Sequence, residues 1–234
     1  MLPDNDREIL RGIADCLDLV GRDGFAARLV ALVERIGADQ VMVFAYEADR
    51  ARCLISRNFD ERALGQHLAE DYLDGWFRQD PLFRLAMDLE EGHGRVVRLA
   101  EYGAAFPPEY RERFYAVPQI GDKTAVLVAG GGLRLGVNVY WREAERAGNE
   151  VLRALGRMVH LHFIQAAPSA VPPALGVLSE RERDVCLGIL AGKKAEIIAH
   201  ELGVKPSSVA TYRARAYEKL GINSRGSLFA ICRG

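Results

Sequence analysis

The chain has 234 residues with 31 basic and 32 acidic side chains, a formal charge of −1, and 49% hydrophobic and 27% charged residues. These ordinary globular values exclude a largely disordered chain, and the length leaves room for one or two domains with hydrophobic cores. The N-terminus is acidic where a secretory signal is basic, and no apolar run approaches the ~18 residues of a membrane span. We therefore expect a soluble, cytoplasmic protein without a membrane partner.

The residues that carry catalytic or metal chemistry are sparse and scattered. The four cysteines have no CxxC spacing and no His pair nearby, so we expect neither a disulfide framework nor a metal site. His160 and His162 are two residues apart on a predicted helix and cannot share a face. No G-x-S-x-G motif is present. We expect no enzymatic activity, no metal and no cofactor.

The first 165 residues show both helix and strand patterns. Apolar residues at helical spacing predict helices near 9–17, 25–36, 61–78 and 143–165. Runs of β-forming residues predict strands at 40–46, 52–56, 124–129 and 133–141. The fold class expected is α+β, with a three-layer α/β/α domain whose antiparallel sheet could hold a small ligand.

A proline-rich segment divides both the chain and its charge. Residues 166–174 contain three prolines and no charge, which is typical of a semi-extended linker. Residues 1–174 carry 21 basic and 26 acidic side chains (net −5), whereas residues 175–234 carry 10 and 6 (net +4). A basic excess in a small segment favours binding to a polyanion. We expect a sensing or dimerisation domain at 1–165, a linker at 166–174 and a second domain at 175–234.

The last sixty residues predict an all-α, four-helix domain with a helix-turn-helix. Ser179 and Glu182 form a capping-box pattern at the start of its first helix. Further helices are expected near 195–202, 206–220 and 224–232, with Pro206 at a first helical position. On the third helix, Val209, Ala216 and Leu220 fall in one apolar stripe, so the opposite face is free to enter a DNA major groove.

This segment resembles the LuxR-type DNA-binding domain. The resemblance is carried, in order, by Leu178–Val185, Gly192, Val209–Ile222 and Ser224-Arg225. It implies that the third helix reads double-stranded DNA and that the last helix can pair in a homodimer. The candidate DNA-binding residues are Lys205, Ser207, Ser208, Ala210, Thr211, Tyr212, Arg213, Ala214 and Arg215.

Two positions depart from that family. Ala210 and Ala214 occupy base-contacting sites of the family, and alanine cannot form a hydrogen bond with a base edge. Direct readout then depends on Ser207, Ser208 and Thr211, with methyl groups against thymine. The cations Lys205, Arg213 and Arg215 are suited to phosphates, which position a protein without specifying sequence.

A second resemblance lies in the N-terminal part. The segment Asp71–Pro81 resembles the Y…D-P stretch of the autoinducer-binding domain of quorum-sensing regulators. The resemblance implies that Asp80 accepts the amide N–H of an N-acyl homoserine lactone and that aromatic rings wall the pocket. The candidate ligand-binding residues are Tyr72, Trp76, Asp80, Phe83, Tyr102 and Asn138.

The N-terminal match is partial and leaves alternatives open. The family's two tryptophans fall on His67 and in the Gly92–Arg95 region, where this chain has none. The domain could therefore bind no ligand and serve only dimerisation or protein contacts, with Asp80-Pro81 a plain turn with a local cap. An enzyme fused to a regulator would require a polar catalytic cluster, and the sequence shows none. A phosphorylation receiver is disfavoured because its paired acids are missing.

The interpretation that combines these features is a LuxR-type transcription regulator with a quorum-sensing-like ligand sensor. In this hypothesis, ligand occupancy near Asp80 and Trp76 stabilises the sensor or its dimer. The linker then allows two DNA-binding modules to occupy neighbouring half-sites, which raises affinity through effective concentration.

Overall fold

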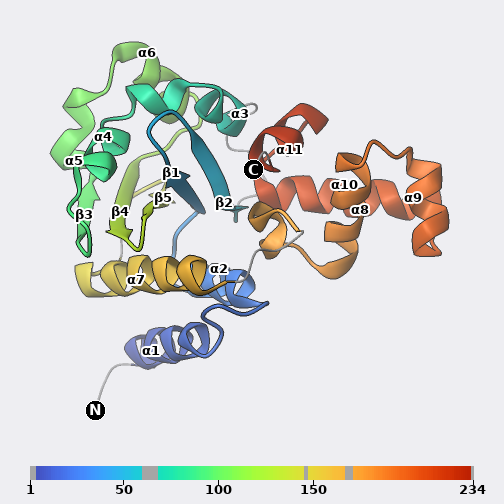
Figure 1. Ribbon diagram of the computed structural model, residues 1–234, viewed down its shortest axis with the longest axis horizontal. Coiled ribbons are helices and arrows are strands. Elements are labelled where there is room, and N and C mark those ends of the chain that lie inside the picture. Colours follow the sequence, from blue (N-terminus) through green and yellow to red (C-terminus); the bar gives the residue numbers. More distant parts are fainter. Residues whose placement is uncertain (1–3, 60–67, 145–146, 167–170, 233–234) are drawn as a thin grey trace.

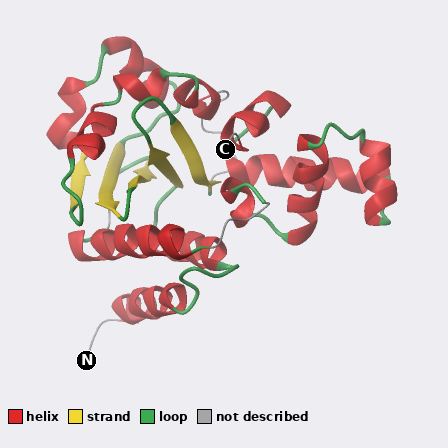
Figure 2. Cartoon of the chain, in the orientation of Figure 1, coloured by secondary structure: helices red, strands yellow, loops and turns green. Residues whose placement is uncertain are grey.

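The computed structural model describes residues 4–59, 68–144, 147–166 and 171–232. Figure 2 shows strands gathered into one sheet between helices, followed by a C-terminal part whose described residues form helices joined by loops. The α+β class expected from the sequence is therefore confirmed. His67, where the family tryptophan was aligned, lies outside the described residues.

One antiparallel sheet forms the centre of the N-terminal part. Its strand order is β2-β1-β5-β4-β3, and all neighbours are antiparallel. The strands are β1 (Gln40–Tyr46), β2 (Ala51–Asn58), β3 (Gly94–Arg98), β4 (Asp122–Gly130) and β5 (Leu133–Trp141). Side chains alternate between the two faces of each strand, so each face of the sheet needs its own cover.

Helices cover both faces, which gives three layers (Figure 1). One face is covered by α2 (Phe25–Arg35) and α7 (Asn149–Gln165), and α1 (Asp4–Leu17) packs outside them. The other face carries α3 (Leu68–Leu73), α4 (Pro81–Asp88), α5 (Leu99–Tyr102) and α6 (Pro108–Arg111), with a π-helical turn at Glu112–Ala116. This second layer contains the segments that resemble the autoinducer-binding domain.

The C-terminal helices begin and end where the local signals predict. They are α8 (Glu180–Leu190), α9 (Ala195–Leu202), α10 (Pro206–Leu220) and α11 (Arg225–Cys232). Gly192, two residues after the end of α8, and Gly203, directly after α9, take positive φ values of 79° and 65°, which glycine adopts without steric cost. Pro206 occupies the start of α10, where its missing N–H removes no helical hydrogen bond.

The C-terminal helices pack against the sheet edge. A 3-10 turn at Pro173–Val177, together with α10 and α11, contacts β2, and α11 also contacts α3 (Figure 1). Ala174, at the end of the predicted linker, is fully buried in this turn. An exposed edge strand invites unwanted pairing with other chains, and here the C-terminal helices cover it.

Two predicted helices need correction, and one strand was not predicted. The helix expected over 61–78 ends at Leu73, because Gly75 adopts φ 128° and a separate 3-10 turn follows at Trp76–Gln79; residues 60–67 lie outside the described part. The helix expected from 143 begins at Asn149, after an extended Gly148. Strand β3 was not predicted, because its exposed edge position leaves it without a regular apolar alternation.

None of the helices in the described ranges combines the length and the apolar character needed to cross a lipid bilayer.

The close approach of α7 to the sheet generates a packing prediction. A Cβ added at Gly156 would lie 2.4 Å from Cγ1 of Val126 and 3.2 Å from Cγ2 of Val128. We expect Gly156→Ala to lower the free energy of unfolding by about 1–3 kcal/mol, because the helix must move away from β4. Urea unfolding followed by circular dichroism measures the change.

The matched control is Gly103→Ala, because its added Cβ would meet Leu99 at an ordinary 3.6 Å and its φ is −55°. We expect the control to change the unfolding free energy by less than about 0.5 kcal/mol. Equal midpoints for the two variants would contradict the packing of α7 described above.

Candidate functional site

Helix α10 separates a buried stripe from an exposed face. Its buried residues are Val209, Ala216 and Leu220, as the helical spacing predicts. The exposed face carries most of the candidate DNA-binding residues, namely Lys205, Ser207, Ala210, Thr211, Arg213, Ala214 and Arg215, while Ser208 and Tyr212 are half-buried. The structure thus brings the nine candidates to one helix and its start, and their contact with DNA stays a prediction.

The polar groups on this face are small and few. The Thr211 hydroxyl donates to the Ser207 carbonyl at 3.1 Å, so in this conformation it is turned toward its own helix. Arg213 and Arg215 project from the exposed side as cations that can reach phosphates. The arrangement provides charge for the DNA backbone and small side chains for close approach to bases.

An ion pair joins α8 to α10. Lys219 Nζ donates to Glu182 Oε2 at 2.7 Å, and the same oxygen accepts from the Ser179 backbone N–H at 2.9 Å, which confirms this half of the predicted capping box. Burial alone would raise the pKa of Glu182, but the hydrogen bonds from Lys219 and Ser179 outweigh it and hold the pKa below its ordinary value. The pair fixes the orientation of the exposed face relative to the first helix of the domain.

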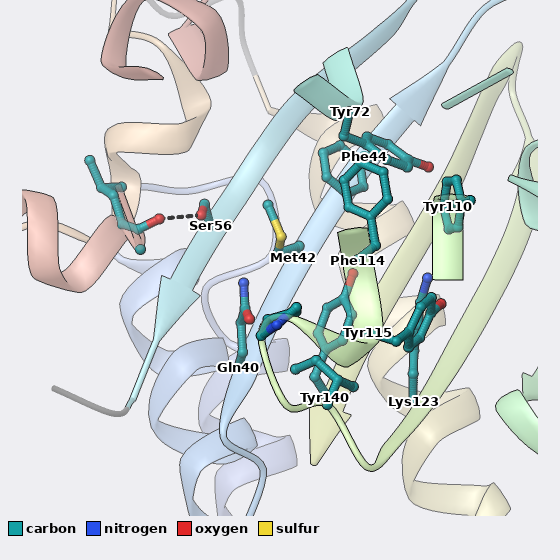
Figure 3. Close-up of a pocket in the computed structure, with 14 residues that line it drawn as sticks. Gln40, Met42, Phe44, Ser56, Tyr72, Tyr110, Phe114, Tyr115, Lys123 and Tyr140 are labelled. Carbon is teal, nitrogen blue, oxygen red and sulfur yellow. Dashed lines mark hydrogen bonds between the residues drawn. The ribbon is translucent and has the colours of Figure 1, made fainter. Parts of the chain in front are cut away.

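A pocket lies between the sheet, the second helical layer and the end of α10 (Figure 3). It has about 590 Å³ of space not filled by atoms, including the part that is open to solvent. Its lining residues are Gln40, Met42, Phe44, Ser56, Tyr72, Tyr110, Phe114, Tyr115, Pro118, Ile120, Lys123, Tyr140, Leu220 and Gly221. Its walls are therefore largely aromatic, with a few polar groups, which is the usual composition of a small-molecule site.

Asp80 is the centre of a buried hydrogen-bond network beside this pocket. Its side chain caps α4 by accepting from the Leu82 backbone N–H at 2.9 Å. Its other oxygen accepts from the hydroxyls of Tyr72 at 3.2 Å and Tyr110 at 3.0 Å. Burial and the charge of Asp80 raise the pKa of Tyr110 well above its ordinary value, so this hydroxyl keeps its proton and donates.

Lys123 of β4 is the one cation among the residues that line the pocket. The side chain is 3% exposed, and its Nζ lies 3.9 Å from Asp80 Oδ2, which is an ion-pair distance but too long for a hydrogen bond. The rings of Tyr115 and Tyr140 lie 5.9 and 5.4 Å from Nζ, within the range of a cation–π interaction. Burial lowers the pKa of Lys123, and the carboxylate of Asp80 opposes that effect.

The six residues predicted to bind ligand are distributed around the pocket rather than all on its surface. Tyr72 lines the pocket. Trp76 packs behind it against Tyr110 and Phe114, with Arg113 over its ring. The other four lie outside the lining: Asp80 in the network above, Phe83 against Tyr46 and Phe77, Tyr102 against Phe106, and Asn138 bonded to the Gly136 carbonyl. Their contact with a ligand stays a prediction.

Several pocket residues were missed by sequence reasoning. Lys123 shares a strand face with Ala125 and Leu127, and this alternation is a signal that the lysine is buried. Tyr115 lies in the π-helical turn at Glu112–Ala116, which brings it into the lining. Local π-helical geometry is frequent at functional sites.

The C-terminal helices contribute one wall of the pocket. Leu220 ends α10 and Gly221 follows it with φ 68°, and both line the pocket. The Ser56 hydroxyl of β2 donates to the Leu220 carbonyl at 2.6 Å, a contact drawn as a dashed line in Figure 3. This carbonyl is one of the last four of the helix, which have no partner within it, so the sheet edge supplies the missing hydrogen bond.

Comparison with known sequences gives the family of the C-terminal domain. Residues 176–231 match the family of bacterial regulatory proteins, luxR family. Over 58 residues the chain is 47% identical to the probable transcriptional regulatory protein NarL of Mycobacterium tuberculosis (strain ATCC 25618 / H37Rv), covering 25% of this chain and 27% of NarL. Over 64 residues it is 42% identical to the response regulator GacA of Pseudomonas protegens, covering 27% and 30%. The chain thus spans less than a third of these relatives.

Comparison with solved structures finds likenesses at low sequence identity. The chromophore-binding domain of the bacteriophytochrome RpBphP3 from R. palustris has a TM-score of 0.50 at 12% identity, covering 70% of this chain and 62% of that one, a likeness of fold alone. The VqsR LBD domain from Pseudomonas aeruginosa has a TM-score of 0.49 at 18% identity over 68% and 99% of the two chains. SdiA in complex with octanoyl-rac-glycerol has 0.42 at 10% identity over 99% and 97%.

The Glu182–Lys219 pair generates a pH prediction. Because the pKa of Glu182 is lower in the folded chain than in the unfolded one, its stabilising contribution is present above about pH 4.3 and is lost as the pH falls through the folded pKa. Glu182→Gln keeps an acceptor for the cap but removes the charge. We expect the variant to be less stable at pH 7, and its deficit to shrink toward pH 3.5, in urea unfolding curves.

The exposed Glu180 in the same helical turn provides the control. We expect Glu180→Gln to follow the wild-type pH dependence closely. A deficit of Glu182→Gln that is equal at both pH values would show that the ion pair does not contribute.

Proposed function

Because residues 176–231 form a luxR-family helix-turn-helix domain, we propose that this protein is a cytoplasmic DNA-binding transcription regulator whose N-terminal domain binds a small molecule and thereby controls DNA binding. The proposal places DNA recognition on α10 and ligand recognition in the pocket lined by Lys123 and Leu220. It assigns no catalytic step to the chain.

The exposed face of α10 supports the DNA-binding part of the proposal. It carries Lys205, Arg213 and Arg215 around a surface of small side chains, and the domain as a whole has a basic excess. Small side chains allow the helix backbone to approach base edges closely, and the three cations can neutralise phosphates on either side.

The observation that carries the sensing part is that both domains line one pocket. Leu220 and Gly221 close the pocket at the end of the same helix that presents Thr211 to DNA. A ligand in the pocket therefore contacts the DNA-reading helix directly. Its binding free energy must depend on whether that helix is docked, which is the condition for a ligand to shift a conformational equilibrium.

Docking also provides a means of controlling dimerisation. Helix α11, which the luxR-type resemblance implicates in pairing, here packs against β2 and α3. In our proposal, release of the C-terminal domain frees α11 to pair with a second copy. Two linked domains then occupy both half-sites of an operator, which raises affinity by effective concentration.

One observation favours a second candidate function. The carboxylate of Asp80, assigned by resemblance to a ligand amide, is occupied by Leu82, Tyr72 and Tyr110. This is expected if the N-terminal domain binds no ligand and serves only dimerisation or protein contacts, because Asp80 then needs all of its hydrogen-bond donors from the protein. A thermal-shift panel of acyl homoserine lactones and small aromatic compounds, with Asp80→Asn as a control variant, distinguishes the two candidates.

The phosphate-contact role of the α10 cations can be tested by salt titration. We expect Arg213→Ala and Arg215→Ala each to weaken binding to the protein's own upstream DNA and to reduce the slope of log affinity against log salt by about 1. Fluorescence anisotropy with the full-length chain measures both quantities. Arg153→Ala, an exposed change on α7, is the matched control and should leave the slope unchanged.

Binding that shows no salt dependence, or equal slopes for all three variants, would contradict the assignment of α10 as the DNA-binding helix.

The contact that docks α10 on β2 can be weakened by removing one oxygen atom. Ser56→Ala removes the hydrogen bond to the Leu220 carbonyl, so we expect a loss of about 1 kcal/mol in the stability of the docked state. Released α11 then pairs more readily, and affinity for DNA with two half-sites should rise by up to about fivefold. Anisotropy titrations and amide exchange at α10 and α11 measure the change.

Gly156→Ala is the control, because it weakens the packing of α7 on β4 without altering any atom at the β2–α10 contact. We expect its DNA affinity to stay at the wild-type value. A Ser56→Ala variant that binds DNA like the wild type, with unchanged exchange at α11, would refute control by docking.

A further inference from the structure

The inference drawn here rests on the proposed sensing function and names the class of molecule sensed. We propose that the pocket binds a small molecule with a flat apolar body and a carboxylate head group, and that the carboxylate is held by the ammonium of Lys123 and the hydroxyl of Tyr115.

The main anionic acceptor beside the pocket is already used by the protein. Asp80 Oδ1 accepts from the Leu82 N–H, and Oδ2 accepts from Tyr72 and Tyr110 at 3.2 and 3.0 Å. Asp80 is 1% exposed and is not part of the pocket lining. Three donors therefore use most of the acceptor capacity of a carboxylate that the pocket does not expose, so the site disfavours ligands that depend on such an acceptor.

The donors beside the pocket are, in contrast, incompletely used. Lys123 Nζ donates no hydrogen bond to any residue in the described part of the chain, and it lies 3.9 Å from Asp80 Oδ2. The hydroxyl of Tyr115 is buried beside that of Tyr102, and neither hydroxyl has an acceptor of normal hydrogen-bond geometry among the described residues. Buried donors without acceptors are costly, and a ligand that supplies acceptor oxygens removes this cost.

The charge balance favours an anion over a neutral acceptor. The charge of Asp80 is shared among a backbone N–H at the start of α4 and two tyrosine hydroxyls, so its compensation does not depend on Lys123 alone. Lys123 is a fully buried ammonium without a hydrogen-bonded counter-ion. A carboxylate can pair with it and accept from Tyr115 at once, and such charge-assisted bonds are the strong ones.

The walls of the pocket define the body of the ligand. Phe44, Tyr72, Phe114 and Tyr140 present rings around the space above Lys123, and Met42 adds a flexible apolar surface (Figure 3). Lys123 and Tyr115 point into the same space in this view. Ring walls of this kind accept a flat aromatic or short aliphatic body by stacking and apolar contact.

The experiment uses full-length protein and three matched pairs of probes. Isothermal titration calorimetry compares benzoate, trans-cinnamate and octanoate with their uncharged amides, and N-octanoyl homoserine lactone serves as a neutral acyl ligand. We expect at least one of the acids to bind and its amide, which has nearly the same shape, to bind at least about tenfold more weakly.

Two variants locate the carboxylate. Lys123→Met should weaken binding of the acid at least about tenfold while affecting its amide little. Tyr115→Phe removes only a hydroxyl and should weaken binding of the acid about threefold to tenfold. Tyr217→Phe is the matched control, because Tyr217 is a half-buried tyrosine that does not line the pocket. Should Lys123→Met fail to fold, the comparison of Tyr115→Phe with Tyr217→Phe decides the question.

Several outcomes of these experiments would contradict the proposed carboxylate site. Equal binding of acid and amide, equal effects of the two tyrosine variants, or no binding of any acid would overturn the inference. Binding of the lactone without binding of the acids would overturn it while leaving the proposed sensor intact. The proposed regulatory function is tested separately: absence of salt-dependent DNA binding in the same preparation would contradict it.

Discussion

The structure of the N-terminal domain depends on the burial of one carboxylate. Asp80 is almost inaccessible to water, so its charge must be compensated by protein groups, since an isolated buried charge is very unfavourable. The compensating groups come from α4, α3, α6 and β4, through Leu82, Tyr72, Tyr110 and Lys123. The same charge therefore starts a helix, ties the second helical layer to the sheet and places an ammonium at the pocket. What the pocket can bind follows from this distribution of donors.

A second constraint is the edge of the sheet. Strand β2 would expose unpaired backbone groups, and the C-terminal helices cover it without adding a strand. Leu220 has three roles at this boundary: its side chain is buried, its carbonyl accepts from Ser56, and the residue forms part of the pocket wall. The helix proposed to read DNA and the pocket proposed to bind a ligand therefore meet at one end of α10, whose continuous backbone hydrogen bonds make it stiff along its length.

The sequence predicted those features that depend on neighbouring residues. The cap at Ser179 and Glu182 and the stripe of Val209, Ala216 and Leu220 depend on spacing within a few turns, and both are confirmed. The continuous helix over 61–78 was wrong because one glycine, Gly75, outweighed the apolar periodicity. The position of Lys123 beside the pocket could not be predicted, because it depends on Asp80, 43 positions earlier, and on rings that are brought close only by the fold. Pairing across such distances is a property of the tertiary structure.

The energies of these contacts indicate how a small molecule could control the protein. A single docking hydrogen bond such as Ser56 to Leu220 contributes about 1 kcal/mol. A ligand present at a hundred times its dissociation constant stabilises the state it prefers by about 2.7 kcal/mol. In the proposed function, a ligand that fits beneath Leu220 and Gly221 holds the helix docked, and a longer one displaces it. The wall that both parts of the chain share would then convert occupancy of the pocket into a change in the availability of α11, without a separate pathway between distant sites.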